Sequence, residues 1–183
     1  MPHQPFHTAR LTLRPLEAGD VAGMFALDSD PAVHRYLGGI GGHMQTEPAQ
    51  SAAVIRHVQA QYAAAGIGRW AVLLRETGEF VGWAGLKLVR EPINGHRDFY
   101  DLGYRLRTPF WGQGYGYEAA QAWLDYGFGP MALPEINAYA DVQNLASCRI
   151  LEKIGLRRQN EFEEDGTRCV WFGRRREEWR AGQ

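Results

Sequence analysis

The chain has 183 residues, 45% of them hydrophobic, which is enough to bury the core of one domain spanning residues 1–183. Its 20 Lys and Arg residues nearly balance 21 Asp and Glu residues, so nothing in the composition indicates a nucleic-acid partner. Cys148 and Cys169 form no CxxC pair, which argues against a disulfide scaffold and a structural zinc site, and we expect no metal. Without a signal-peptide pattern or a long apolar run, we expect a cytoplasmic protein with no membrane partner.

The first part of the chain predicts one strand and two helices. Leu11 and Leu13 alternate with polar residues, which predicts a strand over residues 8–14 that ends at Pro15. A short helix is expected from residue 17 and is broken at Asp30 and Pro31. After a stretch with glycines at 38, 39, 41 and 42, residues 46–65 predict a longer helix, which stops at Gly66.

The remaining elements predict a mixed sheet with helices packed on it. Apolar, β-rich segments predict strands at residues 70–74 and 80–89, and a further strand at 100–107 follows the turn at Asn94-Gly95. Residues 134–141 predict another strand, and Asp165-Gly166 predicts a hairpin between strands 156–163 and 167–174. Helical spacing is found at residues 112–127 and 144–154, and Gly155 ends the second of these helices. Strand 100–107, its following helix and strand 135–141 must then form a parallel crossover.

Three alternating glycines, Gly112, Gly114 and Gly116, stand where a predicted strand becomes a helix. Glycine lets the backbone approach a bulky anion, and the free N–H groups at a helix start favour a phosphate. We interpret the segment as a pyrophosphate cradle; the alternative is that the glycines only permit a tight turn. A P-loop is excluded, because Tyr117 and Glu118 follow where Lys and Ser or Thr are required.

A dinucleotide-binding motif is a second alternative, because residues 114–119 fit the string GxGxxA. That motif would indicate an oxidoreductase with a nucleotide cofactor. The strand before the glycines, however, alternates polar and apolar residues, and the chain ends in an antiparallel hairpin. Neither feature is typical of a dinucleotide-binding fold.

Four segments in register resemble the GNAT superfamily of N-acetyltransferases, namely residues 102–107, 110–119, 144–147 and 151–156. With the opening segment 8–15, the resemblance covers nearly the whole chain. Within the superfamily, the chain resembles the RimJ/RimL-like branch in particular. It implies an α/β (α+β) fold with a mixed, mostly antiparallel sheet of about seven strands, splayed between the fourth and fifth strands, and about four helices. It also implies that acetyl-CoA is the cosubstrate and that the acetyl group passes directly to a primary amine, either of a protein N-terminus or of a small molecule. A homodimer is compatible with the resemblance.

The resemblance also implies a set of cofactor-binding residues. Backbone groups around Tyr104 and Leu106 would pair with the pantetheine arm, and Asn144 would contact it, although Asn144 is equally well placed to cap a helix. Trp111 stands where the family usually has Gln or Arg. The pyrophosphate would be held by backbone N–H groups of Gly112, Gln113, Gly114, Tyr115, Gly116 and Tyr117.

Attack of an amine on a thioester requires a base, because an alkyl ammonium has a pKa of about 10, and a proton for the leaving thiolate. Asp101 is the predicted base, since the branch often has Glu at this position; the alternative carboxylates are Asp98, Glu161, Glu163 and Glu164. Ser147 matches the serine that the branch uses as the acid, and it is alternatively a helix-terminus residue. The tyrosine acid of many family members is replaced by Leu151, so a coenzyme A-binding protein without catalysis stays open as an alternative.

Overall fold

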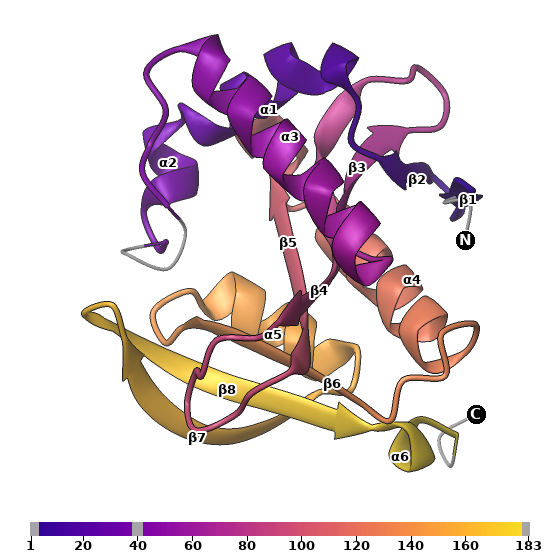
Figure 1. The fold of residues 1–183 in the computed structure, drawn as a ribbon, viewed down its shortest axis with the longest axis vertical. Helices are drawn as coiled ribbons and strands as arrows, with labels where there is room; N and C mark the ends of the chain where they lie inside the picture. The colour runs from indigo at the N-terminus through magenta and orange to yellow at the C-terminus, as the bar shows by residue number, and fades with distance from the viewer. Residues whose placement is uncertain (1–3, 38–41, 181–183) are drawn as a thin grey trace.

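This computed structural model describes residues 4–37 and 42–180; the glycines at 38, 39 and 41 lie outside the described residues. Within these ranges the strands form one eight-stranded sheet in the order β1-β2-β3-β4-β5-β6-β8-β7 (Figure 1). All neighbouring strands pair antiparallel except β5 and β6. The strands are β1 (Phe6–His7), β2 (Leu11–Pro15), β3 (Arg69–Leu74), β4 (Phe80–Val89), β5 (Phe99–Leu106), β6 (Glu135–Asp141), β7 (Arg157–Glu164) and β8 (Thr167–Arg175).

The predicted α+β fold is thus confirmed, and the eighth strand is the short β1, which pairs Phe6 with Leu13. None of the described helices is long and apolar enough to cross a bilayer. The helices are α1 (Val21–Asp28), α2 (Pro31–His34), α3 (Pro48–Ala65), α4 (Tyr115–Phe128), α5 (Leu145–Lys153) and α6 (Arg176–Arg180), with 3-10 turns at Ala18–Asp20 and Thr108–Phe110.

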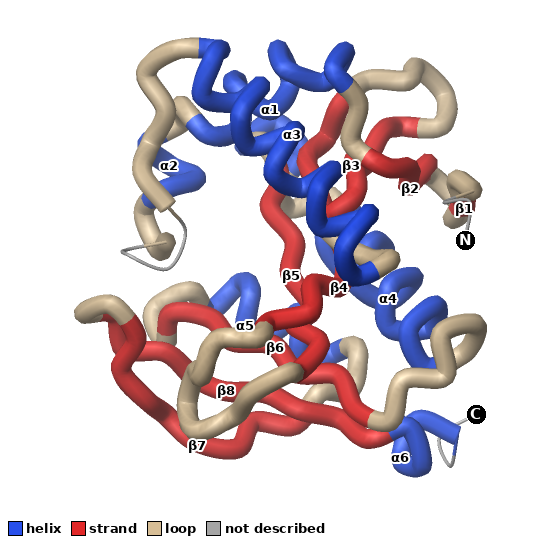
Figure 2. The backbone as a smooth tube through the Cα atoms, viewed as in Figure 1, coloured by secondary structure: helices blue, strands red, loops and turns tan. Residues whose placement is uncertain are grey.

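The sheet splays between β5 and β6, as expected. Their pairing consists of Asp101 opposite Asn137, and beyond this point β5 runs away from β6 toward the α1–α3 layer (Figure 2). The Arg107 N–H donates to the Val81 carbonyl, so the backbone groups of Arg107 face β4. Successive residues of a strand direct their hydrogen-bonding groups to opposite edges. The backbone groups of Tyr104 and Leu106 therefore face the splayed edge.

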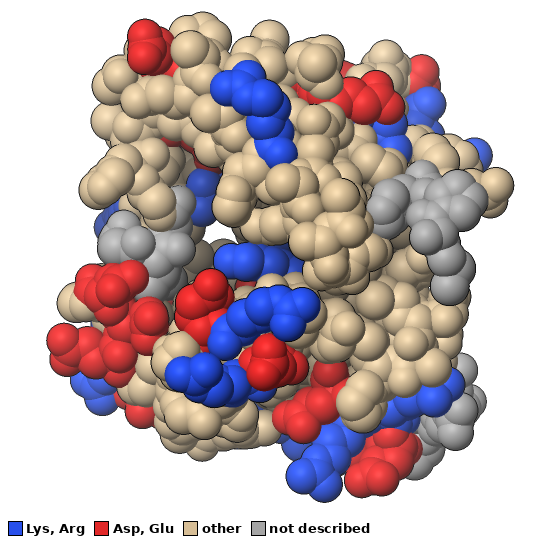
Figure 3. All heavy atoms as spheres, in the orientation of Figure 1, with Lys and Arg blue, Asp and Glu red and all other residues tan. Residues whose placement is uncertain are grey.

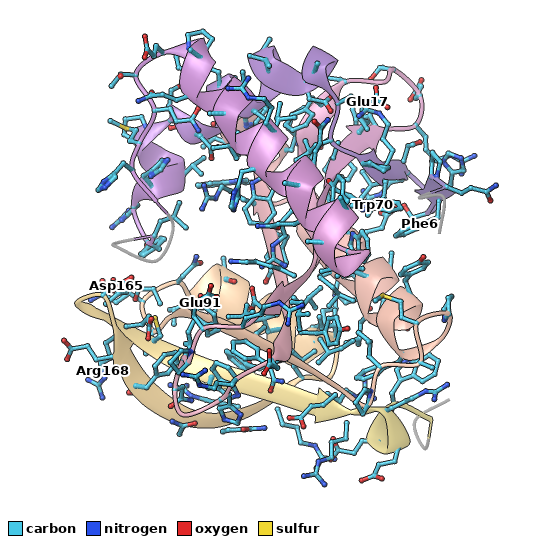
Figure 4. All side chains as sticks on the ribbon, viewed as in Figure 1. Phe6, Glu17, Trp70, Glu91, Asp165 and Arg168 are labelled. Carbon is cyan, nitrogen blue, oxygen red and sulfur yellow. The ribbon has the colours of Figure 1, made fainter. Side chains whose placement is uncertain are left out.

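The helices cover the two faces of the sheet. Asp28 of α1 pairs with Arg105 on one face, and α3 lies against α1 on that side. On the other face, α4 packs so closely that a Cβ at Gly127 would lie 2.6 Å from Ile136 and 2.7 Å from Leu86. Phe6 and Trp70 point toward each other beside α4, with ring centroids 5.6 Å apart (Figure 4). Through this aromatic packing, the short strand β1 is held against β3 and α4.

Besides the short β1, two helices depart from the predicted elements. Asp30 and Pro31 end α1 as expected but also begin α2, because the Asp30 carboxylate accepts the Ala32 N–H and proline suits a first helical turn. The second departure is α6, a final helix after β8 that periodicity did not indicate. Between β7 and β8 the predicted hairpin turn is confirmed, since Asp165 and Gly166 have φ values of 47° and 73°.

Candidate active site

Three cavities with shared lining residues lie along β5, bordered by the segment from α1 to α3 and by the starts of α4 and α5. The first encloses about 440 Å³, the second about 150 Å³ and the third about 260 Å³. Figure 3 shows the surface hollowed here, with basic side chains inside the hollow. Tyr104, Ser147 and Asn144 line both the first and the second cavity, and Arg69, Trp83 and Arg105 line both the second and the third.

The first cavity gathers nearly all of the predicted cofactor residues. It is bounded by α2, the end of β5, the Thr108–Phe110 turn and the starts of α4 and α5. Gln113 is not among its lining residues, because its side chain donates to Pro109 O at 2.8 Å and its carbonyl accepts from Arg10. The predicted residues that line it are Tyr104, Leu106, Gly112, Gly114, Tyr115, Gly116, Tyr117 and Asn144.

The three glycines at the start of α4 serve two different purposes. Gly112 and Gly114 have φ values of 73° and 83°, a left-handed conformation that other residues adopt only with strain. Gly116 has an ordinary helical backbone, but a Cβ there would approach Ile150 Cδ1 to 3.2 Å, so this glycine lets α5 pack against α4. No side chain caps the first turn of α4 within the described ranges. Its N–H groups are therefore directed at the first cavity without a competing acceptor.

The segment between β1 and β2 holds the start of α4 in place. Glu118 accepts hydrogen bonds from Thr8 Oγ1 at 2.5 Å, from the Arg10 backbone N–H at 2.8 Å and from Arg10 Nε at 2.7 Å. The Arg10 guanidinium also lies 4.4 Å from the Tyr115 ring centroid. Burial raises the pKa of Glu118, but these hydrogen bonds outweigh burial and the pKa is lowered overall.

This clamp predicts an acid-sensitive contribution to stability. Because the pKa of Glu118 is lower in the folded than in the unfolded chain, its stabilisation is complete above the unfolded pKa of about 4.3 and disappears as the pH falls through the folded value. We expect the wild type to melt above Glu118→Gln at pH 7, and the two melting temperatures to converge as the pH falls below about 4. Thermal unfolding of both proteins across this range checks it; a constant difference would contradict the assignment.

Two hydroxyl groups meet where the first and second cavities join. Tyr104 Oη lies 3.0 Å from both Ser147 O and Ser147 Oγ. Asn144 Oδ1 accepts the Ser147 N–H at 3.1 Å, so the capping role of Asn144 is confirmed while its side chain also lines both cavities. Trp111 Nε1 donates to Leu106 O at 2.7 Å, which fixes the end of β5 and occupies that carbonyl.

Asp101 is buried where β5 pairs with Asn137 of β6, and it lines the second cavity. Arg69 Nη2 binds its Oδ2, and Arg69 Nη1 donates to the Asp101 carbonyl at 2.7 Å. No hydrogen bond within the described part of the chain involves Asp101 Oδ1. The Arg69 guanidinium lies on Gly103, where a Cβ would approach Nη2 to 2.6 Å. Glycine at 103 is thus required by the guanidinium that lies over it.

Two ion pairs flank Trp83 along the second and third cavities. The Cζ atoms of Arg69 and Arg105 lie 5.3 Å and 5.2 Å from the Trp83 ring centroid, and Arg105 pairs with buried Asp28 at 2.7 Å. We call the series Asp28, Arg105, Trp83, Arg69 and Asp101 the charge row. Of these residues only Asp101 was a predicted site residue, because the register that aligns Arg69, Trp83 and Arg105 on one face is set by strand pairing.

Other candidate groups are placed less favourably. Cys148 is buried behind the cavities, and burial raises the pKa of its thiol. Leu151, at the position of the family's tyrosine, is buried and lines the second cavity. Tyr139 lines the same cavity, and its pKa is raised by burial and by the negative charges of Asp101 and Glu164. The cavity wall therefore retains protonated phenols at neutral pH.

Comparisons with known proteins agree with this geometry. A model of the acetyltransferase (GNAT) domain matches residues 10–157. Protein YkkB of Bacillus subtilis is 35% identical over 150 residues, covering 81% of this chain and 83% of YkkB. The FsC-acetyl coenzyme A-N(2)-transacetylase of Aspergillus fumigatus is 30% identical over 159 residues, covering 85% of this chain and 66% of that enzyme.

One solved structure contains the relevant cofactor. RimL, the ribosomal L7/L12 alpha-N-protein acetyltransferase in complex with coenzyme A, superposes with a TM-score of 0.78 over 94% of this chain and 98% of RimL. The two sequences are 16% identical, so this likeness concerns the fold. The residues matched by the family model, 10–157, include Gly112, Gly114 and Gly116 and every other predicted site residue.

Proposed function

Because this chain belongs to the GNAT acetyltransferase family, in its RimJ/RimL-like group, and is an acetyl-CoA-dependent N-acetyltransferase, we propose that acetyl-CoA binds in the first cavity and that a primary amine enters through the second and third. The two substrates would meet at Tyr104 and Ser147, which line both the first and the second cavity. A sheet with one parallel pair of strands does not fit the oxidoreductase alternative, which needs several parallel units.

The observation that carries the cofactor assignment is the uncapped start of α4. Its glycines expose backbone N–H groups to the first cavity, and the helix dipole adds a positive potential there. Lys153 adds positive charge, since its Nζ lies 4.5 Å from the ring centroid of Tyr117 in this turn, whereas the charge of Arg10 is balanced by Glu118. This end of the cavity suits a pyrophosphate.

The splayed edge of β5 suits the pantetheine arm. Backbone groups of Tyr104 and Leu106 face this edge, and an amide-containing chain can pair with them as an added strand does. The Leu106 carbonyl already accepts from Trp111, so its N–H is the group left for the acyl oxygen. A backbone N–H in this place would stabilise the negative charge that develops on the oxygen during attack.

Acetyl-CoA supplies the acetyl group as a thioester, and the residues of this chain handle the protons. Asp101 takes a proton from the incoming ammonium through Oδ1, since Oδ2 is held by Arg69. The neutral amine forms a C–N bond as the C–S bond breaks; the second amine proton then passes to water, and the thiolate is protonated from water. Ser147 donates a hydrogen bond to the departing sulfur from the wall between the two cavities.

The edge of the acceptor side favours a cationic substrate. The end of β7 and the turn after it carry Glu163, Glu164 and Asp165, and acidic side chains gather at this edge of the molecule (Figures 3 and 4). The negative charge of Glu164 is close enough to Tyr139, in the second cavity, to contribute to the raised pKa of that phenol. An acidic edge raises the local concentration of ammonium groups. Both a protein N-terminus, as in RimL, and a small-molecule amine fit this description.

The test is turnover of acetyl-CoA by the purified protein, with free thiol as the readout. Wild-type protein is incubated with acetyl-CoA and, in separate reactions, with peptides bearing free N-termini, amino acids and polyamines. We expect thiol release that depends on one of these amines and an acetylated product by mass spectrometry. Acetyl-CoA binding without transfer to any amine would instead support the non-catalytic alternative.

A further inference from the structure

We propose that Tyr104 is a positioning residue that controls which way the Ser147 hydroxyl donates its proton. The inference rests on the proposed function above, in which Ser147 donates a hydrogen bond to the departing sulfur. It follows from a contact that the sequence did not indicate, because Tyr104 belongs to β5 and Ser147 to α5, 43 residues apart. Sequence reasoning assigned Tyr104 only its backbone groups.

The phenol has one proton and two acceptors at equal distance. Ser147 O and Ser147 Oγ both lie 3.0 Å from Tyr104 Oη. A carbonyl can only accept, whereas a hydroxyl can donate or accept. When Tyr104 donates to Ser147 O, the serine proton turns to Tyr104 Oη and is withdrawn from the cavity. When Tyr104 donates to Ser147 Oγ, the serine proton is released toward the cavity.

The position of the pair makes this choice relevant to the reaction. Tyr104 and Ser147 are both shared by the first and second cavities, where thioester and amine would meet. Leu151 lies one helical turn beyond Ser147 on α5 and has no proton to offer. The phenol at this junction comes from β5 rather than from α5. It reaches the serine because Gly116 allows α5, through Ile150, to approach α4 beside Tyr104.

The surroundings keep the phenol protonated. Burial raises the pKa of Tyr104, and the hydrogen bond with Ser147 lowers it by less, so Tyr104 is a donor throughout the pH range in which an enzyme works. As the C–S bond breaks, the electron pair stays on sulfur and the thiolate becomes the strongest acceptor present. Ser147 then donates to sulfur, Tyr104 donates to Ser147 Oγ, and the thiolate takes its final proton from water.

A double-mutant cycle with Tyr104→Phe and Ser147→Ala tests this coupling. We expect each single variant to lose about tenfold in kcat, the effect of one hydrogen bond present in the transition state, with KM for acetyl-CoA within twofold of the wild type. The double variant should be no slower than Ser147→Ala. Ser147→Thr, which keeps the hydroxyl, should restore most of the activity.

Tyr100→Phe is the matched control, because Tyr100 is a half-buried tyrosine of the same strand that lies on the same face but lines none of the three cavities. It should turn over like the wild type. Losses that multiply in the double variant, or a Tyr104→Phe protein as fast as the wild type, would overturn the coupling while leaving the acetyltransferase assignment intact. A wild-type protein without turnover would overturn the proposed function, and this inference with it.

Discussion

We expect Gly112→Asp to lose at least a hundredfold in affinity for acetyl-CoA. Gly112 lines the first cavity at the start of α4, and a Cβ there meets nothing within 4 Å, so the new carboxylate enters open space beside the cradle. Two like charges about 4 Å apart repel by roughly 4 kcal/mol near a protein surface, which exceeds the 2.7 kcal/mol that corresponds to about a hundredfold. Isothermal titration with acetyl-CoA measures the loss.

Gly78→Asp provides a closely matched control. Gly78 has a φ of 73°, the same as Gly112, and a Cβ added to it also meets nothing within 4 Å, but it lies in the β3–β4 turn away from the cavities. The two variants therefore share backbone strain and added charge. Wild-type affinity in Gly78→Asp together with lost affinity in Gly112→Asp would locate the pyrophosphate at α4. Equal affinity in both variants would mean that the glycines serve only the turn.

The second large effect is expected at Asp101. Asp101→Asn should lower kcat at pH 7 by at least about a hundredfold, the usual contribution of a general base, while acetyl-CoA affinity stays unchanged. Activity should rise steeply with pH in this variant, because an amine with a pKa of about 10 loses its own proton as the pH increases. The pH dependence of kcat for wild type and variant measures both effects.

Arg69→Gln distinguishes catalysis from structure at this site. Both substitutions break the same buried ion pair, so each should cost about 3 kcal/mol of folding free energy. If Asp101 is the base, Arg69→Gln keeps the carboxylate and loses far less activity than Asp101→Asn. Similar losses in the two variants would show that Asp101 acts only by holding Arg69 over Gly103, and the base would have to be sought elsewhere.

Local patterns were sufficient for most secondary structure. Alternation and apolar runs predicted β4 at Phe80–Val89 and the long helix α3, whose stop at Gly66 is confirmed by a φ of 68°. These features depend on residues adjacent in the chain, and their signals survive without tertiary contacts. The stop at Asp30 and Pro31 was predicted correctly as a break, but the same residues begin α2, since both roles use the same local chemistry.

Contiguous segments of the chain were enough to predict the glycine cradle, the crossover that carries it and the family, because the spacing within each segment has a local physical meaning. The charge row and the Tyr104–Ser147 contact depend instead on how distant segments pack. Arg69 reaches Asp101 because strand register places Gly103 beneath its guanidinium, and Tyr104 reaches Ser147 because α5 folds back over the splayed edge of β5. Such pairings are set by packing between distant segments, on which spacing along the chain carries no information.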